Sequence, residues 1–391
     1  MTRLAVILSH PTQYYSPWFR WLAAHTELQL RVFYLWDFGV TDRRDPKFQR
    51  TVKWDVDLLS GYESEFVPNA ARAPATDRFG GLWNPSLPSR LRRFGPDAVL
   101  FFGYQSRSHL LALAWARLQG IPALFRGDSH FLGRGRPGGA RRVVLATLYR
   151  QFQAFLPVGR ANLDYFRLLG VPAARCHFAP HSVNAAHFDP AATGVREAAA
   201  ALRHSLGIPA HHHVVLFAGK LVALKQPVEL LDAFLAARAP DSTLLLVGDG
   251  PLRPEVERRA AGRGDVRLLP FANQSEMPVR YAMAQLFVLP SRGHYETWGL
   301  AVNEAMHMGV PALVSDLVGC QQDLVTDGDT GWVWQTTGAE GLAGALARAL
   351  HDLRAPTGTG FGARARQRAA RYTYVQTTAG LKQALDDTLR R

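Results

Sequence analysis

The stretch that decides the fold is residues 290–309, PSRGHYETWGLAVNEAMHMG. An apolar run, AQLFVLP, leads into it, and apolar residues then recur at helical spacing from Leu300 and Ala301 onward. The expected order is strand, loop and helix, in which the first helical turn leaves main-chain N–H groups available to an anion. Gly299 has no side chain, so a ligand can approach the main chain there. The stretch therefore predicts an anion site where a strand meets a helix.

Two carboxylates frame this unit, Glu296 in the loop and Glu304 in the helix. Glu304 lies beyond Gly299 by about 7.5 Å along the helix axis, since an α-helix rises about 1.5 Å per residue. A phosphate at the start of the helix would then have one carboxylate on each side. The pattern suits a ligand with hydroxyl groups at both ends and phosphate in the middle, and a nucleotide-sugar fits that description.

The length and composition of the chain favour two domains and a cytoplasmic location. Its 391 residues exceed what one hydrophobic core usually supports. No run approaches the roughly 18 apolar residues that a membrane-spanning helix needs. The first residues, MTRLAVILSHPTQYY, have an apolar core too short for a signal peptide. Cys176 and Cys320 lie far apart without metal-type spacing, which fits a reducing compartment.

The net charge of +13 favours contact with an anionic partner. No helix-turn-helix, zinc-finger, RNP or KH pattern is present, so nucleic acid is not expected. The segment 140–152, ARRVVLATLYRQF, carries Arg141, Arg142 and Arg150 beside an apolar face. It is typical of an ordinary amphipathic surface helix. The alternative is peripheral contact with an anionic membrane at its inner face.

Short apolar runs alternate with segments of helical periodicity along most of the chain. This alternation predicts an α/β fold of doubly wound parallel sheets, each covered by helices on both faces. The segment 189–205 has few large apolar residues and is interpreted as the linker and entry into a second domain. We place the domains at 1–188 and 189–371, followed by a C-terminal helix at 372–391 that packs back toward the first domain.

Three motifs in the chain can each be interpreted in two ways, as a functional site or as an ordinary structural feature. The first strand-to-helix turn places His10 and Gln13 at the ligand-binding edge of a sheet, although His10 is equally well explained as a satisfied turn histidine. The segment 133–138, GRGRPG, matches the letters of a dinucleotide fingerprint, but it does not directly follow a strand, so we expect a basic loop. The triplet 211–213, HHH, is interpreted as a solvated strand start, because neighbouring strand residues point to opposite faces.

Three strand ends in the second half carry residues suited to a diphosphate. The first ends at Gly219 and is followed by Lys220 and Lys225. The next ends in the tight turn 248–250, GDG, and the third leads into 290–309. Because the carboxyl ends of parallel strands share one edge, we expect these turns to line one crevice. Each feature alone is weak evidence for a diphosphate site, whereas the three features in this order are strong evidence for one.

These residues resemble glycosyltransferase family 4, the retaining transferases of the GT-B fold, in which two Rossmann-like domains face each other across a deep cleft. Glu296 and Glu304 match the E-x7-E motif of that family. The run FAGKLVALKQPVELLDAF is similar to its diphosphate-binding segment, and the resemblance covers most of 205–385. It implies transfer of a sugar from a nucleotide-sugar, expected to be a UDP-sugar, to a hydroxyl of a glycan or lipid-linked acceptor in cell-envelope polysaccharide synthesis.

The resemblance also implies roles for individual residues. Lys220 and Lys225 would bind the diphosphate. Glu296 would contact the transferred sugar, and Glu304 would bind the ribose. The catalytic candidates are Lys220, Lys225, Glu296, Asp128 and His130. The donor-binding candidates are Gly219, Phe271, Ala272, Thr297, Trp298, Gly299, Leu300 and Glu304. The first domain would bind the acceptor, with His10 and Gln13 as the candidates on that side.

Two departures from the family pattern lie at the expected reaction centre. Lys220 stands where the family usually has Arg, and lysine lacks the planar fork that grips a phosphate at two points. The histidine that the family usually has near the reacting sugar is either replaced by Asp128 or displaced to His130. The resemblance implies no cofactor and no metal, because protein cations would stabilise the leaving diphosphate. The D-x-D letters at 55–57 and 327–329 are accordingly interpreted as surface loops.

Several other functions remain open at this stage. A nucleotide-sugar epimerase or a sugar phosphorylase can share the fold, and fold alone does not settle function. A noncatalytic nucleotide-sugar-binding module would also keep these residues. A glycosidase would place its two carboxylates across one bond, whereas Glu296 and Glu304 are expected to grip opposite ends of the donor.

Overall fold

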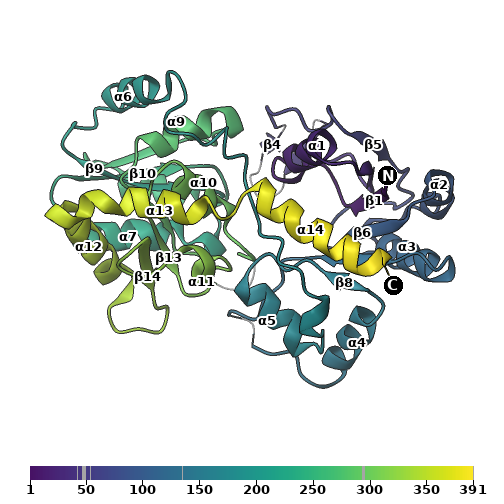
Figure 1. Cartoon of the computed structure of the whole chain (residues 1–391). Helices are drawn as coiled ribbons and strands as arrows, with labels where there is room; N and C mark the ends of the chain where they lie inside the picture. The colour runs from purple at the N-terminus through teal and green to yellow at the C-terminus, as the bar shows by residue number, and fades with distance from the viewer. Residues whose placement is uncertain (42, 46–49, 53, 134, 293–295, 391) are drawn as a thin grey trace.

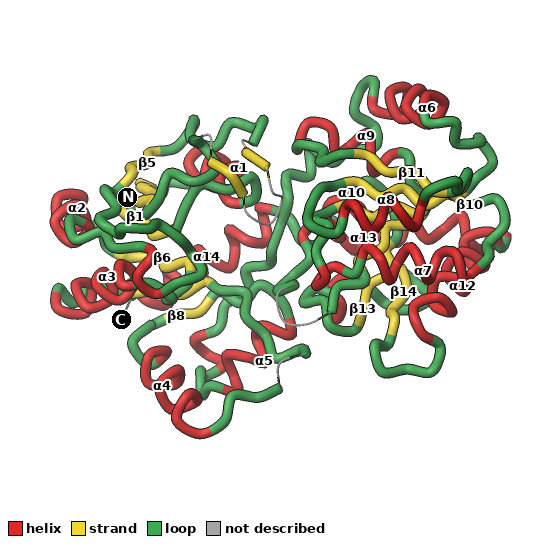
Figure 2. Tube along the Cα trace, turned by 180° about the vertical axis from the view of Figure 1, so that it is seen from behind, coloured by secondary structure: helices red, strands yellow, loops and turns green. Residues whose placement is uncertain are grey.

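A computed structural model describes residues 1–41, 43–45, 50–52, 54–133, 135–292 and 296–390 of the chain. It has two lobes, each built around a parallel six-stranded sheet (Figure 1). Helices lie on both faces of each sheet, as the view from behind shows (Figure 2). The described part of the chain therefore confirms the predicted doubly wound α/β fold.

The first sheet has the strand order β5-β2-β1-β6-β7-β8, with every neighbouring pair parallel. Its strands are β1 (Arg3–Leu8), β2 (Gln29–Tyr34), β5 (Glu63–Phe66), β6 (Ala98–Phe102), β7 (Ala123–Arg126) and β8 (Ala154–Phe155). A small antiparallel hairpin is formed by β3 (Arg43–Asp45) and β4 (Arg50–Val52). The helices of this lobe are α1 (Tyr15–His25), α2 (Leu87–Phe94), α3 (Arg107–Leu118), α4 (Gly139–Tyr149) and α5 (Arg160–Leu168).

The second sheet has the order β11-β10-β9-β12-β13-β14, again with parallel neighbours. Its strands are β9 (His213–Ala218), β10 (Ser242–Val247), β11 (Val266–Leu269), β12 (Leu286–Leu289), β13 (Ala312–Ser315) and β14 (Gly331–Trp334). The strand order reverses between β9 and β12, and ligands of such sheets bind outside the carboxyl ends of the strands at that point.

The helices of the second lobe are α6 (Val195–Ser205), α7 (Pro227–Ala237), α8 (Arg253–Ala260), α9 (Met277–Ala282), α10 (Leu300–His307), α11 (Gln321–Leu324), α12 (Gly341–Arg354) and α13 (Phe361–Ala369). One of them corrects the sequence interpretation. The expected linker contains α6, whose Ala199 is buried in the core of the second lobe, because small alanines can pack closely there.

The cores lie between each sheet and its helices. Strands covered on both faces are nearly continuous apolar runs, and in β9 the residues from Val214 to Phe217 are fully buried. The long C-terminal helix α14 (Tyr374–Leu389) leaves the second lobe and lies along the first, beside α1 and β8 (Figure 1). Its Leu381 and Ala384 are buried in the first-lobe core, and Trp18 Nε1 donates a hydrogen bond to Thr378 Oγ1 at 3.1 Å.

Among the described residues, no helix has the length and apolar character needed to cross a bilayer.

Candidate functional site

The candidate site lies at the carboxyl edge of the second sheet, where its strand order reverses. Strand β9 ends at Ala218 and is followed directly by Gly219 and Lys220, both half-buried. Strand β12 ends at Leu289, and the chain then runs to α10, which begins at Leu300. The two strand ends predicted to share a crevice are therefore neighbours.

Lys225 and Glu296 form an ion pair at this edge. The distance from Lys225 Nζ to Glu296 Oε2 is 2.6 Å, and Ser291 Oγ donates to the same carboxylate oxygen at 3.0 Å. The side chains are 24% and 16% exposed, so the pair is largely shielded from water. The structure thus brings together a predicted phosphate-binding cation and a predicted sugar-binding carboxylate.

The start of α10 lies next to this pair, with Gly299 as its N-cap residue. Gly299 has a φ of 99°, which favours glycine, and a Cβ there would lie 2.9 Å from Val318 Cγ1. The main-chain carbonyls of Glu296 and Trp298 accept hydrogen bonds from the N–H groups of Gly319 and Cys320, at 3.1 and 2.8 Å. These bonds fix the loop that leads into the helix. Thr297 and Leu300 flank it and remain half-buried.

Trp298 contributes packing through its side chain. Its ring is 3% exposed, and Nε1 donates to Asn303 Oδ1 at 2.7 Å. A Cβ on Gly159 of the first lobe would lie 2.2 Å from this ring. The indole therefore fills space between the lobes and leaves only the main chain of Trp298 for the predicted phosphate contact.

Glu304 is buried on the inner side of α10. It is 2% exposed, and its Oε2 accepts a hydrogen bond from the Tyr281 hydroxyl at 2.6 Å. Burial raises the pKa of this carboxyl to about 7, against the opposing contributions of Tyr281, Tyr14 and Gln274. Within the described residues Oε1 has no hydrogen-bond partner. A buried acceptor without a partner is costly, which makes it suited to a ligand hydroxyl.

Glu304 lines a cavity of about 110 Å3 whose walls come from both lobes. The second lobe supplies Gly219, Phe271 and Ala272, as the sequence predicts for the donor site. The main chain of Phe271 is held in place because its N–H donates to Asp249 Oδ2 at 3.0 Å. The remaining lining residues are Gln13, Tyr14, Trp54, Ala218, Val247, Gly248, Gln274, Met277, Tyr281 and Ala301.

A loop of the first lobe reaches over this cavity. The rings of Trp54 and Phe271 have their centroids 6.1 Å apart. The next residue, Asp55, accepts hydrogen bonds from the main-chain N–H of Ser275, at 3.3 Å to Oδ2, and from its hydroxyl. The loop therefore joins the two lobes beside the cavity.

Asp128 follows β7 in the first lobe and faces the second. Its Oδ2 accepts a hydrogen bond from Thr297 Oγ1 at 2.8 Å and lies 3.8 Å from His181 Nε2. Burial acts to raise the pKa of Asp128, but the contacts with His181 and Thr297 outweigh it, so the pKa is lowered. Burial also lowers the pKa of His181. The pair is therefore an ionised carboxylate beside a neutral imidazole.

His130 is held by the main chain at both ring nitrogens. Its Nδ1 accepts from the N–H of Leu132 at 3.1 Å, so Nε2 carries the proton that it donates to the carbonyl of Glu296 at 3.2 Å. These contacts position the Glu296 loop. A direct role of His130 in catalysis stays a prediction.

The two acceptor-side candidates occupy different surroundings. His10 Nδ1 is 3.0 Å from Ser9 Oγ, and its ring packs near Trp36 and Phe38. Burial lowers the pKa of His10 to about 4, as expected for a neutral turn histidine. Gln13 lines the same cavity as Glu304, apart from His10.

Sequence reasoning missed Tyr14, Trp54, Asp55 and His181. Burial raises the pKa of Tyr14, the charge of Glu304 raises it further, and Tyr14 lines the same cavity as Glu304. Its place next to Gln13 at the first strand-to-helix turn could have identified it. Trp54 lies in a region without regular periodicity, so no pattern indicated it, and Asp55 was noted only within the D-x-D letters that were interpreted as a surface loop.

The histidine triplet also differs from its interpretation. Strand β9 begins only at His213, so His211 and His212 are not constrained to alternate faces. Ligand atoms of His211, His212 and Asp241 lie within 4.8 Å of one another. His211 and Asp241 are exposed, and the group lies at the amino end of β9, away from the donor cavity.

Two doubly wound lobes that face each other across such an edge define the GT-B class. HepE of Anabaena, crystallised in complex with UDP and glucose, has the same fold, with a TM-score of 0.73 and 16% identity over 99% of this chain and 100% of that chain. Residues 199–368 match the family described as Glycosyl transferases group 1. This part of the chain belongs to that family.

Two curated relatives extend the comparison. The alpha-D-kanosaminyltransferase of Streptomyces kanamyceticus is 31% identical over 49% of this chain and 50% of its own length. The GDP-mannose-dependent alpha-(1-6)-phosphatidylinositol monomannoside mannosyltransferase of Mycolicibacterium smegmatis is 28% identical over 59% of this chain and 66% of its own length. The chain thus spans about half to two thirds of the length of these relatives.

Proposed function

We propose that this chain is a retaining glycosyltransferase that moves a sugar from a nucleotide-sugar to an acceptor hydroxyl. The observation that carries the proposal is the grouping, at one sheet edge, of the Lys225–Glu296 pair, the start of α10 and the buried Glu304. In this grouping a lysine can bind phosphate, and a carboxylate on each side of it can bind hydroxyl groups of the ligand. The names of the relatives, a kanosaminyltransferase and a mannosyltransferase, support it.

The nucleoside of the donor would occupy the cavity lined by Glu304. The unpartnered Oε1 of Glu304 would accept a hydrogen bond from a ribose hydroxyl, and the base would lie against the main chain of Phe271 and Ala272. We expect a UDP-sugar, in line with the UDP bound by HepE. A GDP-sugar is the alternative, because the mycobacterial relative is GDP-mannose-dependent.

The chemistry follows from the charges that develop as the bond between sugar and phosphate breaks. Negative charge on the leaving diphosphate would be stabilised by Lys225, Lys220 and the N–H groups at the start of α10. Positioned donors of this kind are worth about 2.7–4 kcal/mol each in other enzymes. These protein groups would do the work of a divalent metal, so the proposed reaction needs none.

The D-x-D letters have structural uses that fit this assignment. Asp55 bonds Ser275, and Asp57 Oδ1 accepts hydrogen bonds from the main chain of Leu59 and Ser60. In the second pair, Asp327 accepts from the main chain of Val333 at 2.8 Å. Each carboxylate is already engaged by the protein.

Positive charge at the anomeric carbon would face the first lobe. The ionised Asp128 is the group placed to stabilise it, with His181 and Thr297 holding the carboxylate in position. The acceptor hydroxyl would attack on the face that the diphosphate leaves, so the sugar would keep its anomeric configuration. Trp54 and Asp55 would close the lobes over the donor and limit hydrolysis.

The acceptor is proposed to be a glycan or a lipid-linked glycan of the cell envelope, met at the cytoplasmic face of the membrane. Helix α4 supports peripheral contact, because its Val143 and Val144 are each 65% exposed and lie beside the exposed Arg141 and Arg142. The phosphatidylinositol-linked substrate in the name of the mycobacterial relative points the same way.

The test is turnover of UDP-glucose and GDP-mannose with chelator present, followed by NMR of the sugar product. The proposal expects release of the nucleoside diphosphate, a product of retained anomeric configuration, and no loss of rate on chelation. An inverted product, or a strict need for metal, would refute the mechanism. An epimerised donor would favour a nucleotide-sugar epimerase. A sugar phosphate formed with inorganic phosphate would favour a phosphorylase, and binding without turnover would favour a noncatalytic binding module.

A further inference from the structure

The structure points to an acidic acceptor: we propose that a carboxylate- or phosphate-bearing glycan binds in a cavity of the first lobe lined by Arg136 and Arg141. The inference rests on the proposed function and adds the chemical class of its second substrate. The cavity has a volume of about 560 Å3. It is lined by His130, Phe131, Gly133, Gly135, Arg136, Pro137, Gly138, Arg141, Leu145 and Tyr165.

This cavity begins at the proposed reaction centre. His130 forms part of its wall and also donates to the carbonyl of Glu296, the residue assigned to the transferred sugar. Asp128 lies two residues earlier in the same loop and, with Ser129, lines a further cavity at the carboxyl edge of the first sheet. The proposal places the reacting hydroxyl of the acceptor near Asp128 and its acidic part at the arginines on the other side of this loop.

The charge of the cavity is entirely basic. Arg136 and Arg141 are exposed, and among the described lining residues there is no aspartate or glutamate. The arginines of α8 differ, since Arg258 and Arg259 pair with Glu255 at 2.7 and 2.6 Å. A pair of guanidinium groups with no acid in the same cavity favours an anionic ligand, because Arg binds carboxylate and phosphate through two parallel hydrogen bonds.

The apolar wall of the cavity suits a sugar ring. Phe131 and Tyr165 lie with their ring centroids 4.5 Å apart and their planes at 32°. Such a surface can pack against the C–H face of a pyranose while the polar groups bind at its edge. Leu145 of α4 completes the apolar side and is itself buried.

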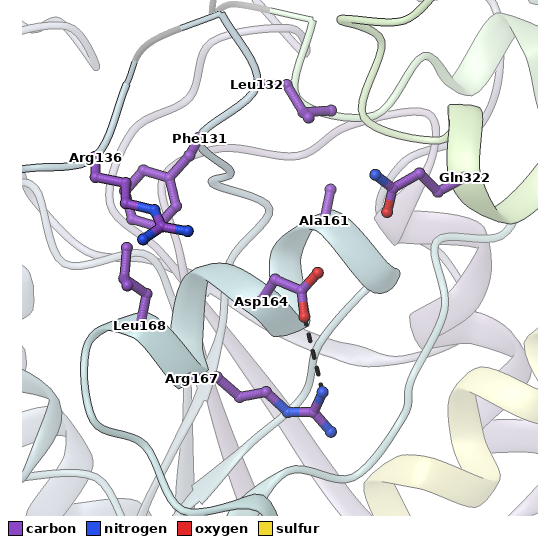
Figure 3. A pocket seen from close by; sticks show the side chains of 8 residues that line it. All are labelled: Phe131, Leu132, Arg136, Ala161, Asp164, Arg167, Leu168 and Gln322. Carbon is purple, nitrogen blue, oxygen red and sulfur yellow. Dashed lines mark ion pairs between the residues drawn. The ribbon is translucent and has the colours of Figure 1, made fainter.

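A second cavity of about 420 Å3 continues the first, sharing Phe131 and Arg136 (Figure 3). Figure 3 shows Arg136 beside Phe131 and, across the opening, Gln322 from the second lobe. The single acid in this part, Asp164, lies 3.7 Å from Arg167, so its charge is offset. The two cavities together have room for several sugar units, which favours a glycan over a single small anion.

The experiment measures binding to printed oligosaccharides in matched pairs, with and without one carboxylate or one phosphate. Native protein saturated with UDP is compared with Arg136→Gln and Arg141→Gln. The control is Arg117→Gln, which removes the same charge from an exposed position in α3 and lies outside both cavities. We expect retention of acidic members only, reduced about tenfold or more in the two cavity variants and less than twofold in the control. The carboxylate and phosphate arms identify which anion is bound.

Several results would overturn the inference. These are retention of neutral glycans only, an equal loss in all three variants, absence of glycan binding, or binding confined to vesicles of anionic lipid. UDP and GDP binding by the native protein is measured by calorimetry in parallel. If a nucleotide binds while the acidic preference is absent, only this inference fails. If neither nucleotide binds, the proposed function fails as well.

Discussion

The ligand-binding edges of the two sheets are built differently. At the second edge the charged groups are paired or buried before any ligand arrives, as in the Lys225–Glu296 pair and Glu304. At the first edge the cavity arginines, Arg136 and Arg141, are exposed in a loop and a helix start. A preorganised edge suits a ligand of fixed shape, because little reorganisation is then needed on binding. The exposed arginines at the edge of the first sheet suit an acceptor, a ligand whose shape differs from one glycosyltransferase to another.

The largest effect on the rate of sugar transfer is expected from Lys225, at the carboxyl edge of the second sheet. Replacing Lys225 by alanine removes the phosphate cation and leaves the Glu296 carboxylate without its ion-pair partner. We expect kcat for sugar transfer to fall by about 10²–10³-fold. Lys382→Ala, which removes an exposed lysine from α14, should leave kcat unchanged. Equal rates for Lys225→Ala and the native protein would break the contrast between the two edges.

The next effect concerns the charge of Glu304. Its pKa is about 7, and the carboxylate accepts a hydrogen bond from a ribose hydroxyl more strongly than the protonated carboxyl does. The affinity for UDP-glucose, whose diphosphate is esterified at both ends and does not titrate in this range, should therefore drop about tenfold between pH 8 and pH 6. Glu304→Gln should bind weakly at both pH values, whereas Glu229→Gln on the exposed face of α7 should follow the native curve. A pH-independent native affinity would contradict the assignment.

The Glu304 carboxyl should also make the stability of the protein depend on pH, in the direction opposite to that of donor affinity. The pKa of Glu304 is higher in the folded protein than its ordinary value of 4.5, so folding takes up a proton between these values. The free energy of unfolding without ligand should fall as the pH rises from 4.5 through 7, by up to about 3 kcal/mol. Glu304→Gln should remove this loss, which thermal melts at pH 5 and pH 8 would measure. A melting temperature of the variant below that of the native protein at pH 8 would count against it.

A smaller effect is expected from the loop that joins the two edges. Trp54→Ala should weaken nucleotide binding about tenfold, since aromatic contacts with a base are worth about 1–3 kcal/mol. Trp54→Phe should retain most of the affinity. Titration of tryptophan fluorescence with UDP and GDP would measure both variants. If alanine and phenylalanine behaved alike, Trp54 would not contact the base.

The smallest effect is assigned to the bond between the lobes. Asp55→Ala removes exposed hydrogen bonds to Ser275, for which water competes, so that their combined contribution is about 0.6 kcal/mol and the KM for the donor should rise about threefold with kcat nearly unchanged. Ser275→Ala should have a similar effect, and the double variant should be no worse than either single one. Additive effects would show that the two residues act separately.

The sequence predicted the second lobe better than the first. In 205–385 the apolar runs and their turn residues have local causes, so the strands and Lys225, Glu296 and Glu304 could be located from pattern alone. The pairing of Lys225 with Glu296 could not, because it joins residues 71 apart in the chain. Nor could the place of Gln13 in the cavity that Glu304 lines, which depends on how the lobes face each other.

The first lobe shows why the rest was not predictable. Trp54 and Asp55 lie in a segment without periodicity, and their contacts with Phe271 and Ser275 form only in the folded chain. No motif in the sequence pointed to His181, because its position beside Asp128 depends on tertiary packing. Arg136 and Arg141 were visible as charges, but the cavity that gives them a role is a property of the folded lobe.

The most direct test of the central claim is calorimetric titration of the native protein with UDP-glucose and GDP-mannose at pH 8, repeated with Glu304→Gln. The account predicts that one of the two donors binds at a single site per chain and that the variant binds it at least about tenfold more weakly. Absence of binding for both donors, or equal affinity in the variant, would contradict the claim that the carboxyl edge of the second sheet is a nucleotide-sugar site.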